Sequence, residues 1–150
     1  ADSRFVLADI PGLFEGTHEG HGLGTRFLCH VERTTVLIHL IDSTQEDVVQ
    51  AYTTIRKELE AYGGGLSDKP EIITLNKIDS LSPEELNEKQ EALEKHCRKK
   101  CFAVSAVSGQ NVRTVLFEAL HAVKCTRLEE TTDDEHHDAY DPTRRKDYTN

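Results

Sequence analysis

Three polar side chains that follow one apolar run have the chemistry to recognise a purine. Asn76, Lys77 and Asp79 come directly after residues 72–75, which have the sequence IITL. A fixed carboxylate at Asp79 can accept two coplanar N–H donors, the pattern that the N1–H and N2–H₂ edge of guanine offers. The amide of Asn76 can donate and accept nearby, and the stem of Lys77 can cover an aromatic face. The motif, with Ile78 inside it, therefore predicts a guanine pocket.

Two further apolar runs end in small polar signatures of the same kind. Residues 5–8 lead into Asp9, Ile10, Pro11 and Gly12, and residues 101–104 lead into Ser105, Ala106 and Val107. Ligands of open α/β sheets bind outside the carboxyl ends of the strands, so the three signatures are predicted to meet at one edge of a sheet. The small residues of the last signature would offer backbone amides to O6 of guanine.

The signature that starts at Asp9 has two interpretations. In the functional one, Asp9 holds Mg²⁺ through a water molecule and Gly12 directs its amide at a γ-phosphate. Glycine is needed there because only glycine lets the backbone approach an anion so closely. In the other, the signature is an ordinary turn that ends a strand. Taken alone, the signature is more typical of the turn; the phosphate role is favoured because the three signatures resemble, in their order, those of the family described below.

The elements that must position these residues alternate along the chain. Ser82 is a predicted helix N-cap, Pro83 stands at the first helical position and Glu85 can complete a capping box. Alternating strands and helices predict an α/β fold with a mainly parallel sheet. Strands are expected at residues 5–8, 36–41, 72–75 and 101–104, and helices at residues 25–34, 46–62, from 83 onward, and 111–124.

Bulk composition narrows the possible partners. The 150 residues are enough for one domain, and a net charge of −9 argues against direct DNA binding. The four cysteines show no zinc-like pairing and are expected to be reduced thiols of a cytoplasmic protein. No signal peptide is visible, and no apolar run approaches the roughly 20 residues needed to span a bilayer. Residues 126–150 are acidic and polar, and we expect a disordered tail there.

The glycine-rich stretch over residues 11–42, PGLFEGTHEGHGLGTRFLCHVERTTVLIHLID, resembles the Obg family of translational GTPase-like proteins in the TRAFAC class. The resemblance extends over roughly residues 3–124 by the order of the motifs. It implies a P-loop NTPase-type three-layer sandwich, with a partial GTPase domain at residues 1–125. It also implies hydrolysis of GTP to GDP and phosphate with Mg²⁺, and the large ribosomal subunit as partner in ribosome assembly. The three signatures would then bind GTP or GDP.

The sequence departs from the family pattern in two places. No Gly-x-x-x-x-Gly-Lys-Ser/Thr loop occurs in these residues, and the first switch with its Mg²⁺-binding threonine is absent as well. Leu13 stands where Ras-like enzymes place a water-orienting glutamine, which predicts slow hydrolysis or a catalytic group from elsewhere. We expect a fold that is incomplete at the N-terminus, and a chain that is inactive and sticky by itself.

Two alternatives remain open from the sequence. The chain could be a truncated, non-catalytic module that binds a guanine nucleotide or a protein. It could also belong to another GTPase group that shares these signatures, such as DRG or Era, although residues 20–24 (GHGLG) favour Obg.

Overall fold

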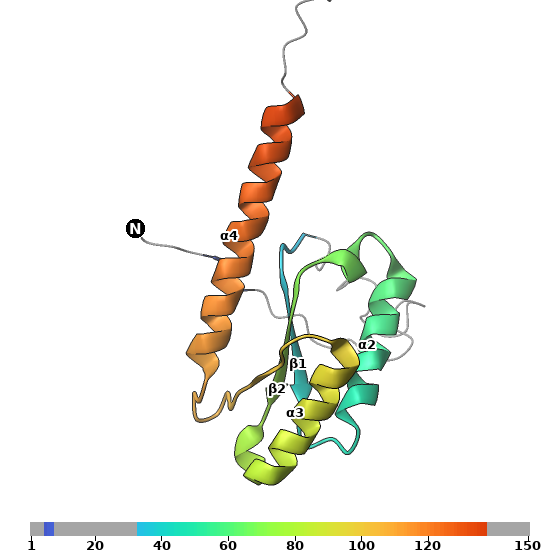
Figure 1. Cartoon of the computed structure of the whole chain (residues 1–150), viewed down its shortest axis with the longest axis vertical. Helices are drawn as coiled ribbons and strands as arrows, with labels where there is room; N and C mark the ends of the chain where they lie inside the picture. The colour runs from blue at the N-terminus through green and yellow to red at the C-terminus, as the bar shows by residue number, and fades with distance from the viewer. Residues whose placement is uncertain (1–4, 8–32, 138–150) are drawn as a thin grey trace, which may run out of the picture.

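A three-stranded parallel sheet forms the centre of the molecule in the computed structural model, which describes residues 5–7 and 33–137 (Figure 1). The strands β1 (Leu37–Asp42), β2 (Glu71–Asn76) and β3 (Phe102–Ala103) are neighbours in that order. The β1–β2 register pairs Leu37 with Glu71 and Asp42 with Asn76. The predicted α/β fold with a parallel sheet is confirmed.

Helices cover both faces of this sheet and give three layers (Figure 1). The helices α2 (Val48–Tyr62) and α3 (Pro83–Cys97) lie on one face, and α4 (Val112–His137) lies on the other. Two short 3₁₀ turns, η2 (Leu66–Asp68) and η3 (Ile78–Ser80), flank β2. None of the helices in the described part of the chain is long and apolar enough to cross a membrane.

Local signals fix where α2 and α3 begin. The side chain of Asp47 caps α2 by accepting a hydrogen bond from the Gln50 amide. At α3, Ser82 accepts from the Glu85 amide while Glu85 accepts from the Ser82 amide, which is the predicted capping box. An N-cap of this kind is worth about 1 kcal/mol, so the start of α3 is well defined.

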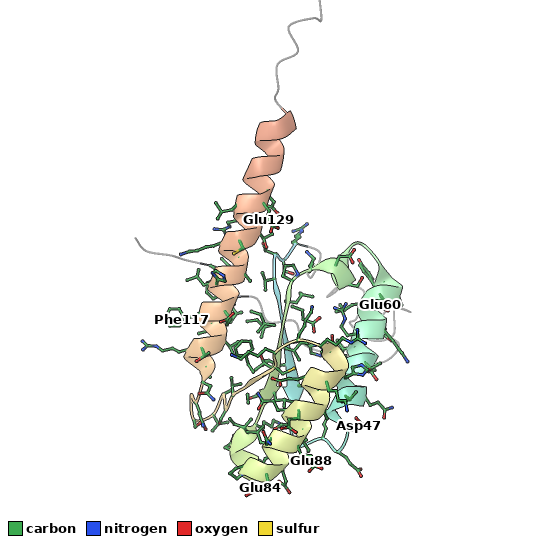
Figure 2. The ribbon with its side chains drawn as sticks, viewed as in Figure 1. Asp47, Glu60, Glu84, Glu88, Phe117 and Glu129 are labelled. Atoms are coloured by element: carbon green, nitrogen blue, oxygen red, sulfur yellow. The ribbon has the colours of Figure 1, made fainter. Side chains whose placement is uncertain are left out.

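The core has one layer on each face of the sheet. Strand β2 contributes to both, because its successive side chains alternate between faces and both faces are covered. The layer under α2 and α3 contains Ile41, Val48, Ile73, Leu75, Leu93 and Cys101, and the layer under α4 contains Ile72, Val104, Val115 and Ala119. Phe117, by contrast, points away from the sheet (Figure 2).

A buried carboxylate joins the sheet to α2. Glu71 lies at the start of β2, and its side chain is only 3% exposed. Its two oxygens accept hydrogen bonds from His39 Nδ1 at 3.0 Å and from Arg56 Nη1 at 2.7 Å. Burial alone would raise the pKa of Glu71, but the hydrogen bond from His39 and the charges of His39 and Arg56 outweigh it, so the pKa lies below its usual value.

The structure corrects two predicted strands. Residues 5–7 of the first predicted strand are not in a strand: Phe5 packs against the α4 layer, whereas Val6 is 94% exposed. The apolar run correctly indicated that Phe5 packs against the core. A strand, however, also needs a hydrogen-bonded neighbour, which an apolar run does not provide. The strand predicted at residues 101–104 is shortened to the two residues of β3. At its start, Cys101 donates its amide to the Glu94 side chain and not to β2.

The last helix is longer than predicted. It was expected to end at residue 124, but α4 continues to His137. Residues 126–137 are therefore helical where a disordered tail was expected; Leu128, Glu129 and Glu130 all have good helix propensity. Residues 138–150 lie outside the described residues, as does most of the helix predicted at 25–34.

Candidate guanine-nucleotide site

The end of β2 is shaped by a backbone turn at Lys77. Lys77 has a φ of 64°, in the left-handed region that residues other than glycine seldom adopt. Ile78 follows, only 7% exposed, and donates its amide to the Val104 carbonyl at 3.3 Å. This anchor brings the η3 turn against the loop after β3. Asn76 and Asp79 therefore face the residues that follow Val104.

Asp79 is in direct contact with the third signature. The buried hydroxyl of Ser105 donates a hydrogen bond of 2.7 Å to Asp79 Oδ1. A carboxylate oxygen has room for more than one donor, so this bond orients the group and leaves both oxygens able to accept from a ligand. The arrangement suits a carboxylate that must present two acceptors in a fixed plane.

Asn76 makes a second link between the same two segments. Its Oδ1 accepts a hydrogen bond of 3.1 Å from the Ala106 amide. The Ser105 amide donates to the Gln110 carbonyl at 3.1 Å. Two of the three amides that were predicted to face guanine O6 are therefore engaged within the protein. Val107, which is 90% exposed, carries the third amide of this signature.

The loop after Ser105 is closed by residues that the sequence analysis did not select. Gly109 has a φ of 80°, which favours glycine, and donates its amide to the Ser105 carbonyl at 2.8 Å. Ser108 donates its amide to Ser105 Oγ at 3.3 Å, and Asn111 Nδ2 donates to the Ala103 carbonyl at 2.9 Å. The signal in the sequence was the Ser-Gly-Gln-Asn run, which is typical of a turn.

Asp42 is a second residue that the sequence analysis missed. It ends β1, and its Oδ2 forms an ion pair of 2.8 Å with Lys77 Nζ. Its Oδ1 accepts hydrogen bonds from the Thr44 amide at 2.9 Å and from Thr44 Oγ1 at 2.6 Å. The hydrogen bonds from Lys77 and Thr44 lower the pKa of Asp42 to about 2, so the carboxylate is ionised at neutral pH.

The edge of the sheet around this pair carries further charge. Lys89 on α3 donates to the carbonyls of Ser43 and Gln45 at 2.7 and 2.8 Å, which fixes the loop between β1 and α2. Glu84 and Glu88 project from the first half of α3 into solvent (Figure 2).

The remaining predicted site residues lie outside the described part of the chain. These are Asp9, Ile10, Pro11 and Gly12, and with them the predicted Mg²⁺ contact of Asp9 and the loop that contains Leu13. Within residues 5–7 and 33–137, no group of three or more His, Cys, Asp or Glu side chains could hold a metal ion. The two carboxylates described at this edge have partners already: Lys77 and Thr44 for Asp42, and Ser105 for Asp79.

A parallel α/β sheet with polar signatures at the ends of its strands is typical of nucleotide-binding proteins. Comparison with known protein families identifies which family of this class the chain matches. Residues 1–77, about half of the chain, match the family described as 50S ribosome-binding GTPase. The chain therefore belongs to this family.

A similar protein narrows the assignment within that family. The chain is 56% identical over 121 residues to the GTPase Obg of Acidiphilium cryptum (strain JF-5). The alignment covers 81% of this chain but 36% of that relative, so the chain spans about a third of the relative's length. The resemblance to the Obg family that was identified from residues 11–42 is confirmed.

Proposed function

We propose that this chain supplies the guanine-recognition part of an Obg-type GTPase that binds GTP and GDP. The observation that supports this most directly is the contact between Asp79 and Ser105, next to the contact between Asn76 and Ala106. Both contacts join the end of β2 to the loop after β3, at the edge where ligands of α/β sheets bind.

The chemistry of the base explains the choice of these groups. Asp79 would accept from N1–H and N2–H₂ of guanine, and adenine has neither donor on that edge. A hydrogen bond to a charged group contributes about 1.5–3 kcal/mol, so two of them give strong discrimination against adenine. The Val107 amide would donate to O6. The aliphatic stem of Lys77 would lie over one face of the purine.

The whole protein's activity extends this proposal. We expect hydrolysis of GTP to GDP and phosphate, in a cytoplasmic protein that acts on the large ribosomal subunit during assembly. The family's description, which names the 50S subunit, supports that partner. Asp9 would hold Mg²⁺ through water and Gly12 would donate its amide to the γ-phosphate. The bound Mg²⁺ would neutralise charge on the phosphates.

The test is nucleotide binding by the complete gene product, with fluorescent GDP as the probe. Asp79→Asn should weaken GDP binding at least about tenfold, because the loss of one charge-assisted hydrogen bond costs about 1.5 kcal/mol or more. The same variant should bind xanthosine diphosphate better than the wild type does, because the asparagine NH₂ can donate to the 2-oxo group of xanthine. If the wild type binds GDP no better than Asp79→Asn, this proposal is wrong.

A second candidate is a binding module without hydrolysis. It would be favoured if the complete gene product, like these 150 residues, contains no Gly-x-x-x-x-Gly-Lys-Ser/Thr loop. The two candidates differ in turnover. Binding of GDP that depends on Asp79, together with no release of phosphate from GTP by the complete gene product, would identify the module.

A further inference from the structure

We propose that Asp42 is a positioning residue for guanine recognition, which acts by fixing the far end of the Lys77 side chain at the carboxyl end of β1. This inference rests on the proposed function, because Lys77 is useful to a ligand only if a purine occupies the site. It adds a residue to the recognition set that lies outside all three signatures and is 35 positions away from Lys77.

The position of Asp42 follows from the strand register. Asp42 is the register partner of Asn76, so the last residues of β1 and β2 lie side by side. Lys77 is the next residue along. Its ammonium therefore reaches back to the neighbouring strand, where it meets Asp42 Oδ2 at 2.8 Å.

The carboxylate is itself held from the other side. Thr44 donates to Oδ1 with both its amide and its hydroxyl, at 2.9 and 2.6 Å. Thr44 cannot easily move, because Lys89 binds the carbonyls of the residues on either side of it, Ser43 and Gln45. One oxygen of Asp42 is thus fixed by its own loop, and the other is directed at Lys77.

Lys77 needs such a partner because it is largely in solvent. Its side chain is 54% exposed, and a free lysine stem has several rotatable bonds whose freedom would be lost when a base binds. The left-handed backbone at Lys77 fixes the start of the stem, and Asp42 fixes its end. A stem held at both ends is already ordered before the purine arrives, which favours binding.

The ion pair with Asp42 also limits which part of the Lys77 side chain can contact a purine. Its ammonium is bonded to Asp42, so its part in recognition falls to the methylene groups. Changes that keep the methylene stem but remove the ammonium should therefore act in the same way as loss of Asp42. If Asp42 acts by positioning Lys77, the two kinds of change should have the same effect on nucleotide affinity. If Asp42 served only as the structural partner of Thr44, their effects would differ.

The experiment is a double-mutant cycle on GDP affinity in the complete gene product. Asp42→Asn keeps the shape and removes the charge, and Lys77→Met keeps an apolar stem without an ammonium. Exposed ion pairs are worth up to about 1 kcal/mol, so Asp42→Asn should raise the Kd for GDP about two- to fivefold. In the Lys77→Met background, Asp42→Asn should change the Kd no further.

Matched controls make the result decisive. Asp68→Asn is the same chemical change at an exposed residue before the start of β2, the opposite end of the strand from the site, and should leave the Kd unchanged. Asp42→Glu keeps the charge and should recover part of the affinity. If Asp42→Asn does not fold, Thr44→Val, which removes only the 2.6 Å bond to Asp42, replaces it in the cycle.

Two results would overturn the inference. One is an Asp42→Asn variant whose GDP affinity matches that of Asp68→Asn. The other is an Asp42→Asn effect that is as large in the Lys77→Met background as in the wild type, which would mean that Asp42 does not act through Lys77. Failure of the proposed function gives a different result, since the wild type would then bind GDP no better than Asp79→Asn does.

Discussion

Two ion pairs of nearly equal length should differ greatly in what they contribute to stability. Arg56 Nη1 lies 2.7 Å from Glu71, and Lys77 Nζ lies 2.8 Å from Asp42. The first pair is buried, with side chains 19% and 3% exposed, whereas the second is 54% and 30% exposed. Burial should decide the difference, because removing one partner of a buried pair leaves an uncompensated charge away from water.

The perturbation is Arg56→Met, with Lys77→Met as the matched control. Loss of a buried partner typically costs 3–5 kcal/mol, but His39 still donates to Glu71, so we expect about 2–3 kcal/mol. Arg56 also donates to the Ser67 carbonyl at 2.8 Å, and that bond is lost as well. For Lys77→Met we expect less than about 1 kcal/mol, since water screens the pair.

The assay is native-state hydrogen exchange at the amides of β1 and β2 in the complete gene product, because it reports the stability of this sheet alone. Arg56→Met should accelerate exchange there by about 30- to 150-fold, which is the fold-change that corresponds to 2–3 kcal/mol. Equal effects of Arg56→Met and Lys77→Met would refute the reasoning, because burial would then not distinguish the two pairs.

Acid titration gives an independent check on the same group. The pKa of Glu71 is lowered in the folded state, so its contribution to stability is complete above the unfolded value of about 4.5 and is lost as the pH falls through the folded value. Arg56→Met removes a cation near Glu71 and so raises its folded pKa. The variant should therefore have less of this stability to lose in acid, and the loss should start at the same pH, near the unfolded value, but be complete at a higher pH.

Two further predictions concern cysteine reactivity and helix capping. Burial raises the pKa of Cys101 to about 12, while Cys125 is exposed on α4. A thiol reagent at pH 8 should therefore label Cys125 before Cys101, and mass spectrometry of a partly labelled sample checks this order. Cys101 labelled as fast as Cys125 would contradict its burial. Ser82→Ala removes the acceptor for the Glu85 amide and should cost about 1 kcal/mol, read as faster exchange in the first turn of α3, while Ser82→Asp should retain most of the stability.

Features encoded by neighbouring residues could be predicted from the sequence. The capping box at Ser82 and Glu85 needs only a three-residue spacing, and it forms as expected. Strand β2 extends only one residue beyond the predicted range at each end. The prediction is this close because the apolar run and the residues that flank it mark both ends of the strand. In both cases the decisive contacts lie within a few positions of each other.

Features that depend on distant partners could not be predicted in this way. Residues 5–7 have an apolar pattern but lack strand structure, because a pattern does not provide a neighbouring strand. The ion pair between Asp42 and Lys77 depends on the register of β1 against β2, which no local spacing reveals. The engagement of the Ala106 amide by Asn76 likewise needs the two loops in place, and the spacing of neighbouring residues does not reveal it.

Backbone strain marks the same region as the polar contacts. Three residues other than glycine have positive φ in the described chain: Lys77, Arg98 and Asn111. Arg98 ends α3, a common place for such a conformation. Lys77 and Asn111 instead border the segments that carry Asp79 and Ser105, and each such residue costs about 1–3 kcal/mol.

That cost must be offset by contacts that hold both turns. Next to Lys77, Ile78 is buried and donates its amide to the Val104 carbonyl. Lys77 itself forms the ion pair with Asp42. At Asn111 the side chain donates to the Ala103 carbonyl. The strained residues Lys77 and Asn111 flank the contacts that join the end of β2 to the loop after β3. Strain that is held in this way favours a rigid, preorganised site over a loop that orders only on binding. The fixed carboxylate of Asp79 is thus a property of the fold around it, set before any nucleotide binds.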